Sequence, residues 1–138
     1  MKPEHFRVPV LPPPPNAHEN EDCRAVASVL ARVGDKWSVF VIMMLDDGPK
    51  RFNELKRRIG GISQRMLTLT LRGLERDGLV TRTVFPTIPP RVDYELTDLG
   101  RGLAKPVAAL GEWVFAHKHE IEGARTRFDR RGEVDQAV

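Results

Sequence analysis

The side chains best suited to specific chemistry in this sequence lie in one short segment, residues 63–76. Four of them recur at spacings of one, three and four residues, so that a helix would present all four on one face: Gln64, Arg65, Thr68 and Arg72. Arginine pairs in a bidentate manner with guanine O6 and N7, and glutamine pairs in the same way with adenine N6 and N7. The major groove of DNA, about 12 Å wide, admits one helix. The segment is therefore predicted to read base edges.

A second set of side chains in the same region suits phosphate binding. Residues 48–91 contain ten Lys or Arg and three Asp or Glu, whereas the whole chain has a net charge of only +3. Positive charge gathered in one segment favours an acidic partner such as a nucleic acid. Ser63 is the expected N-cap of the base-reading helix, whose N-terminus attracts anions. The residues that we expect to contact phosphate, directly or from the hairpin loop, are Lys50, Arg51, Ser63 and Arg91.

The spacing of apolar residues predicts the elements that position these side chains. Helices are predicted over residues 23–33, 35–45, 51–59 and 63–76, and a longer one from about 98 to 120. Gly60-Gly61 predicts the turn before the base-reading helix, because glycine adopts positive φ without steric cost. Alternating residues predict strands over 79–85 and 92–96. The proline-rich loop between them is too long for a tight turn and is predicted to project.

This order predicts a mainly α fold with a small β-hairpin, which is a winged helix-turn-helix whose wing is the projecting loop. Residues 1–20 contain six prolines and predict a flexible N-terminal arm. Residues 21–122 are predicted to form the DNA-binding and dimerisation domain. Residues 123–138 have no apolar periodicity and predict a flexible C-terminal tail.

The sequence argues against several other classes of protein. No apolar run approaches the roughly 20 residues that a membrane span requires. A single cysteine cannot form an internal disulfide, which favours a reducing, cytoplasmic location. The four histidines lack the spacing of metal ligands, and there is neither a glycine-rich phosphate loop nor a nucleophile motif. We therefore expect no enzymatic activity, no metal, no cofactor and no membrane partner.

Cys23 and three longer blocks of sequence resemble the HxlR family of bacterial transcription regulators, which are MarR-like winged-helix proteins. The blocks are GDKWSVFVIMMLDDGPKRFNEL, GISQRMLTLTLRGLERDGLV and PPRVDYELTDLG, and the resemblance covers residues 23–113. It implies a homodimer that binds double-stranded operator DNA near promoters, and we expect a repressor. It also implies that the helix over 63–76 enters the major groove. The wing over 85–91 would then lie on the adjacent backbone or minor groove.

The resemblance implies that the first and last helices form the dimer. The apolar stripe of the last helix supports this, because it is longer than one small domain needs. Two-fold pairing would bury it and place two base-reading helices about 34–36 Å apart, one turn of DNA. The expected interface residues are Val26, Leu103, Val107, Leu110, Trp113 and Val114. The alternative is that the last helix packs only on its own domain.

The signal to which such a regulator responds is open at this point. Several members of the family sense oxidants or electrophiles through a cysteine at the start of the first helix, which implies a redox-sensor role for Cys23. The alternative is that this cysteine is an inert, small apolar residue.

Two further hypotheses remain. A small apolar effector would bind between the core and the dimer helices, unless the same side chains are plain core or interface: Trp37, Phe40, Met43, Met44, Trp113 and Phe115. Alternatively, the chain is a winged-helix protein-interaction module without specific DNA binding. The base-pairing side chains of residues 63–76 argue against this last hypothesis.

Overall fold

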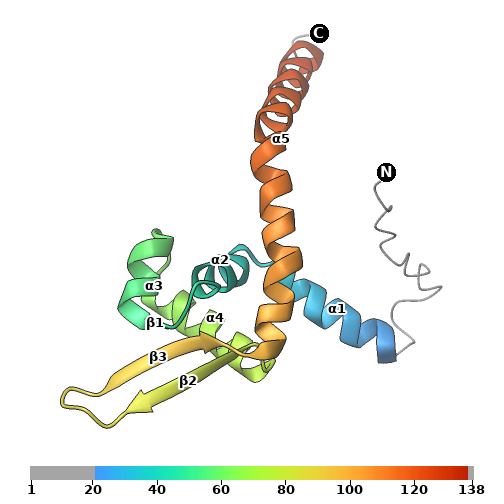
Figure 1. The fold of residues 1–138 in the computed structure, drawn as a ribbon. Coiled ribbons are helices and arrows are strands. Elements are labelled where there is room, and N and C mark those ends of the chain that lie inside the picture. Colours follow the sequence, from blue (N-terminus) through green and yellow to red (C-terminus); the bar gives the residue numbers. More distant parts are fainter. Residues whose placement is uncertain (1–20, 137–138) are drawn as a thin grey trace, which may run out of the picture.

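The computed structural model describes residues 21–136, so the predicted Pro-rich arm over 1–20 lies outside the described residues. Within this range the chain forms five helices and three strands (Figure 1). In chain order they are α1 (Glu21–Gly34), α2 (Lys36–Leu45), β1 (Lys50–Arg51), α3 (Phe52–Ile59), α4 (Gln64–Arg76), β2 (Val80–Phe85), β3 (Arg91–Leu96) and α5 (Asp98–Gln136). The predicted winged helix-turn-helix is confirmed, with α3 and α4 as its two helices and β2 and β3 as its wing.

Local sequence explains where α2 and α4 begin and how the chain turns between α3 and α4. Asp35 caps α2 by accepting hydrogen bonds from the backbone N–H groups of Trp37 and Ser38. The Ser63 hydroxyl caps α4 by accepting from the N–H of Met66 at 3.0 Å. Gly60 and Gly61 have φ of 67° and 71°, so the turn between α3 and α4 uses the freedom of two glycines, as predicted.

The sheet contains one strand more than the sequence predicted. Its order is β1-β3-β2, all antiparallel, with Lys50 paired to Tyr94 and Arg82 paired to Tyr94 on the other side. The strand β1 has only two residues, both basic, so it has no apolar alternation from which it could be recognised. It anchors the start of α3 to the wing.

A single apolar core lies between α2, α4, the sheet and the start of α5. Leu67, Leu71 and Leu74 form the buried stripe of α4, and each is at most 1% exposed. They pack against apolar side chains of the surrounding elements. These core side chains include Val41, Ile42, Leu45, Leu55, Ile62, Val80, Leu96, Ala104 and Val107. Burial of this stripe fixes which face of α4 is turned outward.

An ion pair joins α1 to the C-terminal end of α4. The Arg32 Nε lies 2.7 Å from the Asp77 carboxylate. The Arg32 guanidinium also covers Gly73, where an added Cβ would lie 2.8 Å from its central carbon. The first helix is therefore attached to the helix that carries the predicted base-reading residues.

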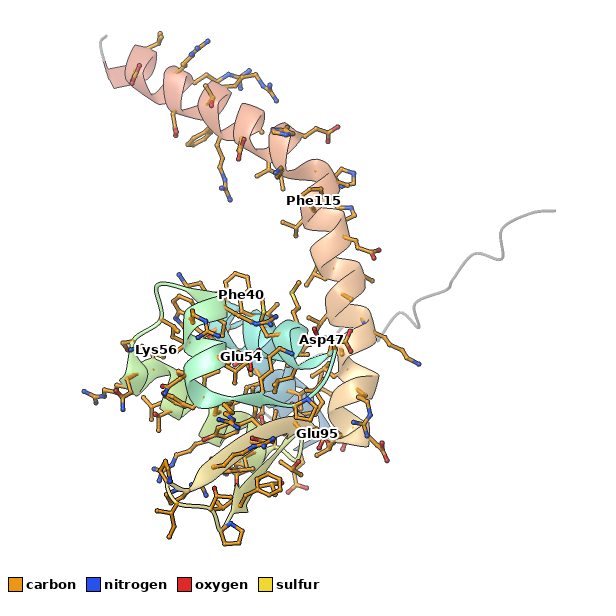
Figure 2. All side chains as sticks on the ribbon, turned by 60° about the vertical axis from the view of Figure 1, so that its left-hand side comes forward. Phe40, Asp47, Glu54, Lys56, Glu95 and Phe115 are labelled. Atoms are coloured by element: carbon orange, nitrogen blue, oxygen red, sulfur yellow. The ribbon has the colours of Figure 1, made fainter. Side chains whose placement is uncertain are left out.

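The last helix is longer than predicted. It continues to Gln136, so residues 123–136, which the sequence analysis placed in a flexible tail, are helical. No proline follows Pro106 before the end of α5, and extending an existing helix costs far less than nucleating one. Figures 1 and 2 show this distal part projecting away from the domain. Although α5 has 39 residues, no helix within residues 21–136 is apolar enough over a sufficient length to cross a membrane.

Candidate nucleic-acid interface

The outward face of α4 carries the four side chains predicted to read bases. Gln64, Arg65, Thr68 and Arg72 are all exposed, because the leucine stripe occupies the opposite face. The Thr68 hydroxyl donates to the Gln64 carbonyl at 2.9 Å, which leaves its oxygen as an acceptor. Neither arginine has a carboxylate partner within 4 Å among the described residues. Both guanidinium groups are therefore available to a ligand.

Two apolar side chains on the same helix were not singled out from the sequence. Met66 and Leu69 are 41% and 52% exposed. Apolar side chains in a major groove contact the thymine methyl group. Their position beside polar neighbours was visible in the sequence, but the apolar residue type favoured the core.

The structure places Lys50 inside the fold rather than on the surface predicted to face DNA. Its side chain is only 6% exposed, and its ammonium group donates to the Asp47 carboxylate. This hydrogen bond lowers the pKa of Asp47 below its usual value. Lys50 thus has a carboxylate partner, whereas the neighbouring Arg51 is exposed and makes no ion pair within the described range.

Arg91 is held against the wing. Its guanidinium group donates two hydrogen bonds to Asp93, at 3.0 and 2.9 Å, and lies 5.1 Å from the centre of the Phe85 ring. The hydrogen bond from Arg91 is the main cause that lowers the pKa of Asp93 below its usual value. A phosphate contact by Arg91 has to compete with this partner.

The wing tip itself is apolar. Ile88 is fully exposed, with Pro86, Pro89 and Pro90 around it. The Thr87 hydroxyl donates to the Pro89 carbonyl at 2.8 Å, so the hydroxyl hydrogen at the tip is already used in a bond within the loop. The sequence analysis identified the loop but not Ile88, since a lone apolar residue in a loop carries no periodic signal.

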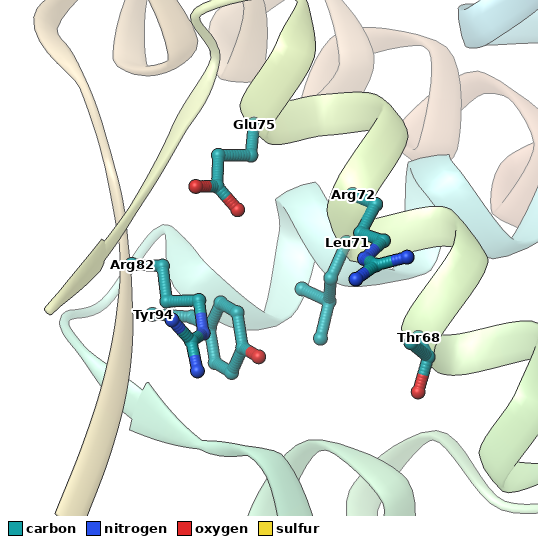
Figure 3. A pocket seen from close by; sticks show the side chains of 6 residues that line it. All are labelled: Thr68, Leu71, Arg72, Glu75, Arg82 and Tyr94. Atoms are coloured by element: carbon teal, nitrogen blue, oxygen red, sulfur yellow. The ribbon is translucent and has the colours of Figure 1, made fainter. Parts of the chain in front are cut away.

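A cavity of about 350 Å³ opens between α4 and the sheet (Figure 3). It is lined by Thr68, Leu71, Arg72, Glu75, Arg82 and Tyr94. Arg82 and Tyr94 are cross-strand partners on β2 and β3, and neither was a candidate from the sequence. Pairing across strands brings them together with α4, which residue spacing alone does not reveal.

The predicted dimer residues divide into two groups. Leu103 and Val107 belong to the subunit's own core, where Val107 is 2% exposed. The other four lie at the surface on two helices: Val26 on α1, and Leu110, Trp113 and Val114 on α5. Helix α1 buries none of its residues, although its apolar side chains are aligned on one face. The domain therefore leaves apolar stripes of both helices uncovered.

The residues considered for a sensor or effector are dispersed. Cys23 is a free, half-buried thiol in the first turn of α1. Trp37 and Met44 pack against the core, whereas the remaining effector candidates are exposed: Phe40, Met43, Trp113 and Phe115. Among residues 21–136 no cluster of three or more His, Cys, Asp or Glu side chains is arranged to hold a metal ion.

Known proteins share both the fold and the sequence pattern. Residues 32–122 match the family described as HxlR-like helix-turn-helix. The chain is 40% identical over 111 residues to the HTH-type transcriptional regulator YybR of Bacillus subtilis, an alignment that covers 80% of this chain and 89% of YybR.

Two solved structures extend this comparison. A protein described as the transcriptional regulator YtfH of Salmonella typhimurium superposes with a TM-score of 0.69 at 38% identity, over 73% of this chain and 90% of that one. The redox regulator HypR in its reduced form superposes with a TM-score of 0.67 at 42% identity, over 72% of this chain and 98% of HypR. The family match over residues 32–122 includes α3, α4 and the wing, which carry the exposed arginines.

Proposed function

The chain belongs to the HxlR-like helix-turn-helix family of transcriptional regulators, and we propose that it acts as a repressor that binds operator DNA as a homodimer. The observation that carries this proposal is the outward face of α4, where Gln64, Arg65 and Thr68 are exposed and Arg65 has no ion-pair partner among the described residues. These side chains have the hydrogen-bonding groups that distinguish base pairs in the major groove.

The wing supports a contact with the groove next to α4. Its tip presents Ile88 between prolines rather than a free cation. Apolar side chains are used by minor-groove proteins as wedges against base steps. Ile88 would then touch the minor groove, while Arg51 and the Ser63 hydroxyl contact phosphate beside α4. Lys50 and Arg91 are each paired with a carboxylate, so each pair would add little net positive field.

The uncovered apolar stripes of α1 and α5 support the homodimer. Leu110 and Val114 are about half exposed, and the apolar residues Ile121 and Phe128 continue their stripe at intervals of seven. A seven-residue repeat favours pairing between helices. A second copy covers both stripes by two-fold symmetry and also supplies the second base-reading helix. A dimer bound across a promoter would block access by the polymerase.

Replacing Arg65 by alanine tests the assignment of the base-reading face. Loss of one bidentate base contact is expected to weaken binding to the preferred duplex by about 1–3 kcal/mol, with a smaller effect on a scrambled duplex. Fluorescence anisotropy on duplexes selected from a random pool measures both affinities. The control is Arg57→Ala, which removes the same charge from the exposed surface of α3. Equal losses for the two variants on both duplexes would show that Arg65 does not read bases.

Cys23 provides a second proposal, that a thiol-reactive signal releases the DNA. The similarity to the redox regulator HypR and the half-buried free thiol in α1 support it. Because α1 is joined to α4 by the Arg32–Asp77 ion pair, modification of its first turn has a route to the base-reading helix. We expect a quinone to lower the operator affinity of the wild type and to leave that of Cys23→Ser unchanged. Release that persists in Cys23→Ser would contradict the proposal.

A further inference from the structure

The cavity between α4 and the sheet adjoins the base-reading face and has a chemistry of its own. Arg72 reaches it from α4, and Arg82 reaches it from β2 (Figure 3). Both side chains are exposed, and neither has a carboxylate within 4 Å among the described residues. By contrast, five other Arg or Lys side chains of the domain are ion-paired in the described residues: Arg32, Lys50, Arg58, Arg91 and Arg101. Two unpaired guanidinium groups at one cavity indicate a site for an anion.

The other groups that line the cavity determine how many hydrogen-bond donors are available to an anion. Tyr94 is half-buried in the cavity wall, and no hydrogen bond of its hydroxyl is found within the described residues. Thr68 already donates to the Gln64 carbonyl, so its hydroxyl adds no free donor. Leu71 is the apolar residue of the cavity lining. The free donors are therefore two arginines and one tyrosine, a set that fits a phosphate group.

We propose that this cavity seats one phosphate of the DNA backbone, held by Arg72 and Arg82 with the Tyr94 hydroxyl as an additional donor. The proposal rests on the proposed function. If α4 lies in the major groove and the wing tip reaches the next minor groove, the strand between the two grooves has to pass over the space between α4 and the sheet. Arg72, which the sequence analysis assigned to base reading, then contacts the backbone at the end of that face instead. Arg82 fixes the angle between helix and wing on the duplex.

The carboxylate of Glu75 would repel a bound phosphate, so replacing Glu75 and replacing Arg82 should change DNA affinity in opposite directions. The Glu75 carboxylate lines the same cavity, and it has no ion-pair partner among the described residues. A fixed negative charge at this position repels a phosphate, so the seat lies on the side of Arg72 and Arg82 away from Glu75 (Figure 3). Removing the charge is expected to tighten DNA binding, whereas removing Arg82 is expected to weaken it.

The experiment measures affinity and its salt dependence for Arg82→Ala, Glu75→Gln and the control Arg76→Ala. Arg76 is exposed on α4, is unpaired within the described residues and does not line the cavity. Arg82→Ala is expected to lose about five- to tenfold on selected and scrambled duplexes alike and to reduce the salt slope by about one. Glu75→Gln is expected to gain affinity on both duplexes. Arg76→Ala is expected to change affinity less than twofold.

A neutral methylphosphonate placed at one backbone position at a time separates this seat from general electrostatic attraction. With the wild-type protein, a methylphosphonate at one backbone position next to the α4 contact is expected to reduce affinity as much as Arg82→Ala does on unmodified DNA. In Arg82→Ala that position is expected to show little further loss, since the phosphate and the arginine are partners. Competition by inorganic phosphate at constant ionic strength reports whether the site instead prefers a small free anion.

Two results would overturn the phosphate seat while the wild type still binds its selected duplex. One is that Arg82→Ala and Arg76→Ala behave alike. The other is that millimolar inorganic phosphate displaces DNA from the wild type but not from Arg82→Ala, which would assign the cavity to a free anion. If the wild type itself prefers no selected duplex over a scrambled one, the proposed function fails. That failure is seen in the wild type alone and is therefore distinct from failure of the phosphate seat.

Discussion

Replacing Leu110 and Val114 together by glutamate is expected to yield a monomer and to lower operator affinity by about 10²–10⁴-fold. Both side chains are about half exposed in the subunit, at 50% and 47%, so their replacement leaves the core intact. In a two-fold dimer each glutamate would be buried against apolar side chains, and burying an unpaired charge is costly. A monomer presents one base-reading helix and loses the gain from binding two half-sites at once.

Light scattering after gel filtration measures the mass, and anisotropy measures the affinity for a selected duplex with two half-sites. Phe115→Glu is the matched control, because Phe115 is an exposed apolar residue of α5 whose position does not fall on the seven-residue spacing of the stripe. It is expected to remain dimeric. A double variant that stays dimeric, with unchanged affinity, would remove α5 from the proposed interface.

Replacing Gly100 by alanine is expected to destabilise the folded protein by about 2–3 kcal/mol. Gly100 lies in the first turn of α5, where its buried Cα approaches the Leu79 carbonyl so closely that an added Cβ would clash with the backbone oxygen. Thr97 fixes the same junction, since its hydroxyl donates to the Gly78 carbonyl at 2.6 Å and accepts from the Gly100 N–H at 3.0 Å. Relief of the clash therefore requires the helix to move away from β2.

Gly102→Ala is the control for this prediction. An added Cβ at Gly102 meets no atom within 4 Å, and alanine is expected to stabilise the helix by about 0.5–1 kcal/mol because it lowers the backbone entropy of the unfolded chain. Denaturant unfolding at one protein concentration compares the two variants, which removes the effect of dimerisation on the midpoint. Equal stabilities would contradict the close contact at Gly100.

Residue spacing predicted α4 because the signals that mark this helix are local. The Ser63 cap, the two glycines of the turn and the leucine stripe each depend on residues within one or two turns of the chain. These features determine which face of α4 is exposed, and so the four polar side chains on it followed directly.

The features that sequence reasoning missed depend on contacts between distant segments. Lys50 has the residue type of a phosphate ligand, yet pairing of β1 with β3 buries it beside Asp47. Arg82 and Tyr94 face the same cavity only because β2 and β3 pair in one register. The distal part of α5 was missed for another reason. Residues 123–136 have no core of their own subunit to pack on, and Phe128 alone among them continues the seven-residue spacing of Val114 and Ile121.

The most direct test of the central claim is the affinity of the wild-type protein for DNA from its own upstream region, compared with a scrambled duplex at two salt concentrations. The proposed repressor is expected to bind its upstream DNA at least about 10³-fold more tightly than the scrambled duplex, with both affinities falling steeply as salt rises. Equal affinities for the two duplexes would contradict specific recognition at that region. If duplexes selected from a random pool also showed no preference, the winged helix would be a protein-interaction module instead.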